Sequence, residues 1–186
     1  QIGWGAHHCW PEALVAYSYL TRVQSKPSKV AFSAAMHVVK WMHQTRTRGI
    51  SWRSDGNRVM YGTTDSSDVG DKKDGRVQYG GHTTLAGGVV GAWSHKQRDV
   101  GGGSATVEYQ SFKDAASAMV WAKELLTDMG FEHWFKEPMA LYGDNDCAND
   151  WAQTGKITKA NQYIRRDYHI VMEMVERNVA GASGGA

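Results

Sequence analysis

Three aspartates, the first of them Asp144, lie close together in the segment LYGDNDCAND (141–150). A calcium-binding loop of the EF-hand type needs oxygen ligands at alternating positions, a glycine at the sixth position and a glutamate at the twelfth. Counted from Asp144, the sixth position is Asn149 and the twelfth is Gly155. The sequence therefore excludes such a calcium loop and leaves two interpretations, a metal site of another kind and a solvated turn.

Two further acids lie where they could join Asp144. Asp144 follows residues typical of a buried strand, and Asp65 follows a second such run, YGTT. Glu108 precedes Phe112 by one helical turn, so it shares the core-facing side of an expected helix and points toward a sheet. Oxygen ligands from two strand ends and a helix suit Mg²⁺ or Mn²⁺. Acids at these positions also form turns or stabilise helix dipoles, so the pattern alone leaves both interpretations open.

Cysteine and histidine usage gives little support to other chemistry. Cys9 and Cys147 are far apart and form no Cys-x-x-Cys pair, which is typical of a reducing compartment and offers no disulfide framework. The run His7-His8-Cys9 contains three potential zinc ligands, but adjacent side chains point in different directions in any regular structure. We therefore expect no zinc site there.

Composition limits the class of protein without naming a partner. A chain of 186 residues with 41% hydrophobic content can bury one core, and its formal charge of +2 means that a nucleic-acid surface must arise from local arrangement. No apolar run is long enough to span a membrane and no secretory signal opens the chain. The expectation is a soluble, intracellular protein with no membrane partner, and the start at Gln1 indicates a fragment or a piece of a longer polyprotein.

The pattern along the chain predicts a mixed α+β sheet with an N-terminal helical appendage. The strand that ends at Asp65 is expected to be central, with antiparallel strands on one side and a parallel strand, PMALYG, on the other. A long helix over about 106–129 should pack on this sheet. The expected units are a helical joining segment over 1–50, a sheet domain over 51–178 and a flexible tail over 179–186.

Five segments in order along the chain resemble motifs of one known family. They are the long segment from PEALVAYSYL to GISW (11–52), YGTTDSSD (61–68), WSHKQRDVGGGSATVEY (93–109), LYGDNDCA (141–148) and RDYHIVME (166–173). This series resembles the RNase H domain of copia-type long-terminal-repeat retrotransposons, with the segment that joins it to the reverse transcriptase. The resemblance implies an RNase H-like fold and metal-dependent endonucleolytic cleavage of the RNA strand of RNA/DNA hybrids. It also implies the reverse transcriptase part of the same polyprotein as a partner.

The same resemblance implies roles for individual residues. Asp65 would bridge two metal ions, Glu108 would be the helix carboxylate, and Asp144 would close the fourth strand. Two Mg²⁺ or Mn²⁺ ions roughly 4 Å apart would activate a water and stabilise the leaving 3′ oxygen. Asn145 would help to place the hybrid.

Three polar residues after an expected strand could also meet a nucleic acid. His95, Lys96 and Gln97 precede the glycine-rich link to the long helix, where polar side chains can contact a phosphate backbone. We therefore predict a contribution to nucleic-acid binding from these three residues.

The chain also departs from the family pattern. Thr106 takes the place of the first glutamate of the Glu-Ala-Glu-Tyr motif, and the family's last strand and helix, which supply a fourth carboxylate, have no counterpart in the pattern here. Asp167 could substitute, although a surface ion pair with its arginine neighbours fits it better. Cleavage by these residues alone is therefore expected to be weak or absent. The alternatives are an inactive RNase H-like scaffold that binds nucleic acid, and an unrelated α+β binding protein.

Overall fold

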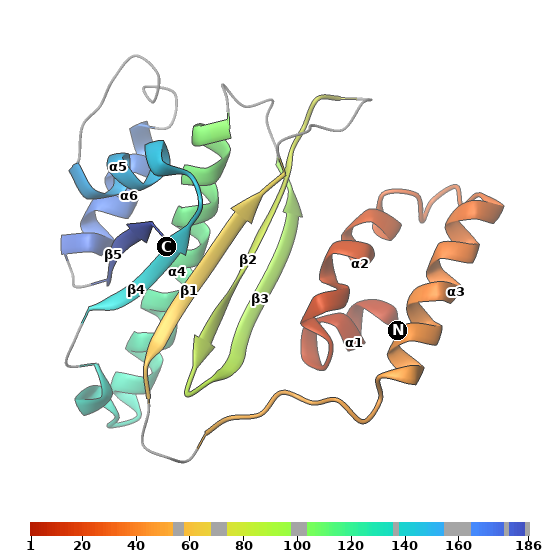
Figure 1. The fold of residues 1–186 in the computed structure, drawn as a ribbon, viewed down its shortest axis with the longest axis horizontal. Coiled ribbons are helices and arrows are strands. Elements are labelled where there is room, and N and C mark those ends of the chain that lie inside the picture. Colours follow the sequence, from red (N-terminus) through yellow and green to blue (C-terminus); the bar gives the residue numbers. More distant parts are fainter. Residues whose placement is uncertain are drawn as a thin grey trace.

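A computed structural model describes residues 1–53, 58–67, 74–97, 104–135, 138–154, 165–176 and 179–184. Five strands form one sheet in the order β3-β2-β1-β4-β5 (Figure 1). Their bounds are β1 Met60–Ser66, β2 Gln78–Leu85, β3 Gly88–Lys96, β4 Met139–Gly143 and β5 Val179–Gly184. Strands β1, β2 and β3 pair antiparallel, whereas β4 is parallel to β1 and β5 is parallel to β4. The predicted mixed sheet with β1 at its centre is confirmed.

Helices cover one face of the sheet and form a separate group beside its β3 edge. On the covered face lie α4 (Ser104–Asp128), α5 (Asp146–Thr154) and α6 (Arg165–Glu176), while α1 (Ile2–His8), α2 (Leu14–Thr21) and α3 (Lys29–Gln44) lie beside β3 (Figure 1). Short 3-10 helices occupy Pro11–Ala13 and Glu132–Trp134. We call residues 1–53 the appendage. No helix in the described ranges is long and apolar enough to cross a membrane.

The expectation of a flexible tail over 179–186, and of a sheet without a last strand, is wrong for Val179–Gly184. These residues form β5, with Met139 of β4 opposite Val179. The segment VAGASG has Val179 as its one β-branched residue and no aromatic residue, so its local pattern does not predict a strand. Pairing with β4 covers an edge whose backbone groups would otherwise be open to other strands.

The main core lies between the sheet and α4. Met60, Leu141 and Met139 from the strands pack against Phe112 and Met119, which repeat along the buried side of α4. Gly62 of β1 allows the helix to approach closely, because a Cβ there would lie 2.7 Å from Sδ of Met119. This contact fixes α4 directly over β1.

The β2–β3 connection is a tight hairpin turn. Ala86 and Gly87 have φ angles of 51° and 78°, as the central residues of a type I′ hairpin turn do. The two strands on either side of this turn bring His95 and Lys96 back to the same end of the sheet as Asp65.

The appendage packs on the sheet through a small core and a polar junction. Ala6, Leu14 and Met42 form its buried cluster, with Ala92 of β3 packed against it. The junction centres on Gln78 of β2, whose Nε2 donates to Ser18 Oγ at 3.1 Å and whose Oε1 accepts from Nη2 of Arg22. The appendage is therefore fixed beside β2 and β3.

Candidate metal centre

Near the end of β1, successive side chains face alternately toward α4 and away from it. Thr64 and Ser66 face the helix, where Thr64 contacts Ser111 and Ser66 contacts Glu108, while Asp65 between them is exposed on the other side. Asp65 lies opposite Gly80 of β2, which has no side chain to crowd it. The strand therefore presents Asp65 at its open carboxyl end.

Glu108 lies on the second turn of α4, one turn before the fully buried Phe112, and only 4% of its surface is exposed. The backbone N–H of Ser66 donates to Glu108 Oε1 at 3.1 Å, and Ser66 Oγ–H donates to the same oxygen at 2.6 Å. The other oxygen, Oε2, is buried and has no hydrogen-bond partner among the described residues. A buried carboxylate oxygen without a partner is costly unless a cation or a proton satisfies it.

Asp144 is placed by the residues on either side of it. Gly143 ends β4 against α4, and a Cβ on it would lie 2.6 Å from Cζ of Phe112. Oδ1 of Asn145 accepts a hydrogen bond from the backbone N–H of Ala148 at 3.0 Å and so caps α5. Nδ2 of Asn149 donates a hydrogen bond to the Gly143 carbonyl at 3.1 Å. Close packing before Asp144 and a capped helix after it hold this exposed carboxylate at the strand end.

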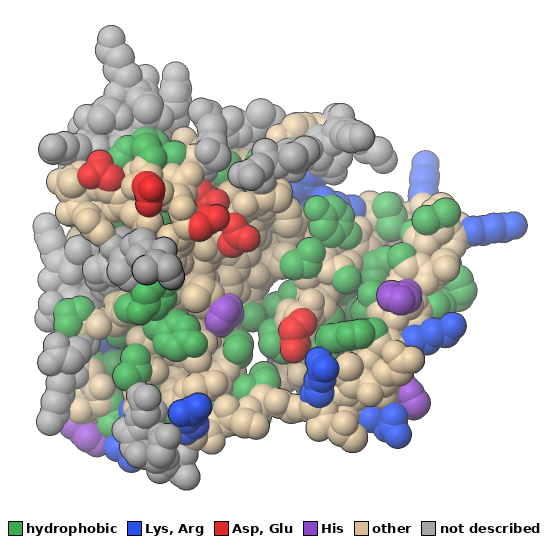
Figure 2. All heavy atoms as spheres, viewed as in Figure 1, with side chains coloured by type: hydrophobic (Ala, Val, Ile, Leu, Met, Phe, Trp, Pro, Cys, Tyr) green, Lys and Arg blue, Asp and Glu red, His purple; other side chains and the backbone are tan. Residues whose placement is uncertain are grey.

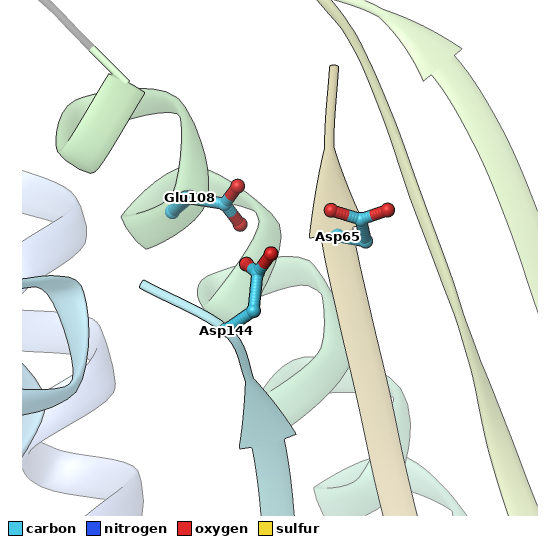
Figure 3. A group of neighbouring side chains, drawn as sticks. All are labelled: Asp65, Glu108 and Asp144. Carbon is cyan, nitrogen blue, oxygen red and sulfur yellow. The ribbon is translucent and has the colours of Figure 1, made fainter. Parts of the chain in front are cut away.

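The three carboxylates meet in one place, as Figure 3 shows, with Asp65 from β1, Glu108 from α4 and Asp144 from the end of β4. Each offers an oxygen, and these oxygens all lie within 4.8 Å of one another. We call these three residues the carboxylate cluster. Within the described part of the chain, no other group of three metal-ligating side chains comes together.

The electrostatics of Glu108 reflect this crowding. Burial raises the pKa of Glu108 above its ordinary value, the hydrogen bond from Ser66 Oγ lowers it, and the negative charges of Asp144 and then Asp65 raise it further. The net pKa is raised despite the two hydrogen bonds from Ser66. A divalent cation would remove the repulsion and satisfy Oε2, so the residues present fit a hard cation with oxygen ligands.

The other predicted site residues lie in different surroundings. His95 is exposed, Lys96 pairs with Asp74 at 2.8 Å, and Gln97 is buried at 3% exposure, where its Nε2 donates to Gln110 Oε1 at 3.2 Å. Asn145 uses its side-chain oxygen as the α5 cap. The side chain of Asp167 lies outside the described residues.

Sequence reasoning missed Ser66 and Gln78. Ser66 was visible only as part of a polar run after the strand, and nothing in that run indicates that its hydroxyl reaches a helix 42 residues away in sequence. Gln78 lies at the start of a strand and meets α2 only through the tertiary fold.

Comparisons with known proteins find both similar sequences and similar solved structures. No protein-family model matches the chain. The chain is similar to the retrovirus-related Pol polyprotein of transposon RE2 from Arabidopsis thaliana, of the copia type, with 24% identity over 172 residues, or 89% of this chain. It spans only 11% of the length of that polyprotein. It is also 29% identical over 111 residues to the secreted RxLR effector protein 161 of Plasmopara viticola, covering 60% of this chain and 78% of that protein.

Solved structures similar to this chain are RNase H domains. RNase H1 of Halobacterium salinarum has 18% identity and a TM-score of 0.43, with 63% of this chain and 76% of that chain covered. The N-terminal RNase H domain of a Mycobacterium tuberculosis protein has 9% identity and a TM-score of 0.48 over 67% and 78%. LC11-RNase H1, isolated from compost, has 13% identity and a TM-score of 0.49 over 67% and 81%.

Proposed function

We propose that the chain is a retrotransposon-type RNase H that cleaves the RNA strand of RNA/DNA hybrids at the carboxylate cluster. The observation that carries this proposal is that Glu108, Asp65 and Asp144 each bring a carboxylate oxygen within 4.8 Å of the others, while the buried Oε2 of Glu108 has no hydrogen-bond partner among the described residues. Three carboxylates fixed on two strands and a helix are what a divalent metal site for phosphodiester cleavage needs. The similarity to a copia-type Pol polyprotein supports the same reading.

Asp65, Glu108 and Asp144 would hold Mg²⁺ or Mn²⁺. Such ions, when bound, supply an activated water and stabilise the leaving 3′ oxygen. The protein's own contribution is positional, because Ser66 orients Glu108 and favours its charged form, and the β1 and β4 ends fix the two aspartates. Enzymatic cleavage and metal dependence are parts of this proposal.

Substrate would approach from the side of the sheet that α4 leaves uncovered. Asp65 lines a cleft of about 620 Å³ between the appendage and strands β1 to β3, together with Thr63, His82 and Tyr19. Thr63 Oγ1 and His82 Nδ1 lie 2.8 Å apart on this face. A hybrid is recognised mainly through its shape, phosphates and 2′-hydroxyls, which polar groups of this kind can contact.

We propose that the chain acts as part of a longer polyprotein. Its partner would be the reverse transcriptase part of the same polyprotein, and it would act inside the cell, because the Arabidopsis relative is a transposon Pol polyprotein. Cleavage of the RNA strand after DNA synthesis would follow directly from that association.

One observation favours a second candidate function, a hybrid-binding module without cleavage. Among the described residues three carboxylates gather, whereas the family resemblance implies four. A site with an incomplete ligand set can hold a cation or a nucleic acid without efficient chemistry.

The test is cleavage of an RNA/DNA hybrid labelled on the RNA strand, compared with RNA/RNA and DNA/DNA duplexes, in Mn²⁺. We expect slow cutting of the RNA strand of the hybrid only, lost in Asp65→Asn. Hybrid binding without cutting would favour the second candidate. Metal-dependent cutting that Asp65→Asn leaves unchanged would refute the assignment of the site.

A further inference from the structure

A second cavity lies beside the β3 edge of the sheet. It measures about 690 Å³, and residues of α1 and α2, of β2 and β3, and of α4 line it. This volume lies within the range of small-ligand sites in proteins. We call it the edge cavity. The carboxylate cluster contributes none of its lining residues.

Basic groups from three parts of the fold converge on the edge cavity. Arg22 comes from the end of α2, Lys96 from the end of β3 and Lys113 from α4. Asp114 is the one acid among the described residues of the lining; it accepts a hydrogen bond from Tyr79 at 2.9 Å and lies 3.9 Å from Lys113. Asp74, beside the lining, pairs with Lys96 at 2.8 Å, so the three cations stand against two neighbouring acids among the described residues.

The charge of the whole appendage has the same sign. Its basic residues are Arg22, Lys26, Lys29, Lys40, Arg46, Arg48 and Arg53, against Glu12 as the one acid in residues 1–53. In Figure 2, Lys and Arg side chains stand out along the appendage, whereas acidic side chains gather over the β1 and β4 ends. An anionic ligand is thus attracted to the side of the molecule where the edge cavity lies.

A buried amide in the cavity wall lacks one of its hydrogen bonds. Gln97 is 3% exposed, its Nε2 donates to Gln110, and its Oε1 has no partner among the described residues. If both amides are rotated by half a turn, the unpartnered atom becomes a donor instead of an acceptor. Gln97 can therefore accept one hydrogen bond from a ligand in the first orientation, or donate one to it in the second, and this observation is independent of the charges.

Two aromatic pairs line the cavity on its two sides. The Tyr79 and His95 rings on the sheet side are 6.1 Å apart, and the His7 and Tyr17 rings on the appendage side are 5.6 Å apart. Such rings provide stacking surfaces for a nucleobase, beside cations suited to its phosphate. Together the groups match a nucleotide better than a simple anion.

We propose that the edge cavity binds a nucleotide, with its phosphate held by Arg22, Lys96 and Lys113 and one polar group held by the Gln97 amide. The nucleotide is either free or part of a nucleic-acid strand. Ser94 of the cavity wall pairs with Gly80, which pairs with Asp65, so the wall and Asp65 lie two strands apart, roughly 10 Å. A nucleic-acid strand bound at Asp65 can therefore reach the edge cavity. Binding here does not depend on cleavage at the carboxylate cluster.

The test is isothermal titration calorimetry of the full chain with AMP and with a short single-stranded DNA oligonucleotide, in EDTA so that the carboxylate cluster holds no metal. We expect binding of at least one probe. Gln97→Leu should weaken it by about tenfold, because it removes a hydrogen bond to a charged ligand while keeping the side-chain volume. Lys113→Gln should weaken it and reduce its salt dependence. The matched control is Lys123→Gln, further along α4 and outside the cavity lining.

The results separate the two sources of the nucleotide. Equal affinity for AMP and the oligonucleotide would assign a free nucleotide, and binding of the oligonucleotide alone would assign a backbone phosphate. Circular dichroism checks that Gln97→Leu folds, and the half-buried Lys113 provides the test if it does not. Failure of the native chain to bind either probe, or unchanged affinity in Lys113→Gln, would overturn the proposal, whatever the outcome of the cleavage assay.

Discussion

Ser66 donates two hydrogen bonds to one oxygen of Glu108, from its hydroxyl at 2.6 Å and from its backbone N–H at 3.1 Å. This leaves Oε2 of Glu108 as the oxygen available to a cation, close to the carboxylates of Asp65 and Asp144. Ser66, which follows the proposed ligand Asp65 in the sequence, thus orients Glu108, another proposed ligand on α4. Groups that hold a ligand in this way strongly affect metal affinity.

Ser66→Ala should lower Mn²⁺ affinity by roughly 10-fold to 100-fold, the usual effect of losing such a supporting group. The lost hydroxyl bond also raises the pKa of Glu108 further, so binding should need a higher pH than in the native chain. Calorimetric titration of Mn²⁺ across a pH series measures both effects. Ser117→Ala is the matched control, since Ser117 Oγ donates only within α4, to the Lys113 carbonyl at 2.7 Å. Native affinity in Ser66→Ala would contradict the orienting role.

Glu108→Gln should stabilise the metal-free protein at neutral pH. The pKa of Glu108 is raised in the folded state above its ordinary value of 4.5, so between these two pKa values the folded chain binds more protons than the unfolded chain. The contribution of Glu108 to stability is therefore full below pH 4.5 and is lost as pH rises through the folded pKa. An amide in place of the carboxylate removes this loss.

Urea unfolding in EDTA, followed from pH 4 to pH 8, measures the difference between Glu108→Gln and the native chain. The midpoint of the variant should rise relative to native as pH increases, and added Mg²⁺ should stabilise only the native chain. Glu124→Gln, at an exposed position of the same helix, should follow native at every pH. If the urea midpoints of Glu108→Gln and the native chain change with pH in the same way, Glu108 is not a buried carboxylate with a raised pKa.

Gly143→Ala should disturb the carboxylate cluster through packing. A Cβ at Gly143 would lie 2.6 Å from Cζ of the fully buried Phe112, so β4 must move away from α4 and carry Asp144 with it. We expect a loss of about 1–3 kcal/mol in the free energy of unfolding and weaker Mn²⁺ binding. Gly91→Ala in β3 meets no atom within 4 Å and should change neither quantity. Equal behaviour of the two variants in urea unfolding and Mn²⁺ titration would refute the close approach.

Gln78→Leu should loosen the appendage from the sheet. Gln78 is buried, and its amide donates to Ser18 at 3.1 Å and to Ser94 at 2.7 Å while accepting from Arg22. Removing the amide leaves its hydrogen-bond partners unsatisfied and lowers the free energy of unfolding by about 1–3 kcal/mol. Hydrogen exchange should speed up in α2 before it does in α4.

Gln44→Leu, at an exposed position of α3, is the control for this exchange measurement. Unchanged exchange in α2 of Gln78→Leu would show that the apolar cluster around Leu14 is sufficient to fix the appendage.

Local patterns in the sequence predict the sheet, and together with the family resemblance they point to a shared site for the three acids. Asp65 and Asp144 each follow a strand-like run, and Glu108 repeats with Phe112 on one helix side. What the sequence does not predict depends on contacts between distant segments. VAGASG becomes β5 only because β4 offers an unpaired edge beside it.

Burial of single polar residues is equally hard to predict from sequence. Gln97 reads as part of a polar run, yet its backbone continues from β3 and turns its side chain toward Gln110 of α4. The pairing of Ser66 with Glu108 requires β1 and α4 to be packed first.

The most direct test of the central claim is Mn²⁺ affinity measured by calorimetry for the native chain, Asp65→Asn, Glu108→Gln, Asp144→Asn and Asp146→Asn. Asp146, exposed in the first turn of α5, lies outside the cluster and is the control. Loss of a direct ligand should cost at least the roughly tenfold seen for supporting groups. The account predicts that each of the three cluster variants loses that much affinity while Asp146→Asn binds as the native chain does. Native-like binding by the cluster variants, or an equal loss in Asp146→Asn, would contradict it.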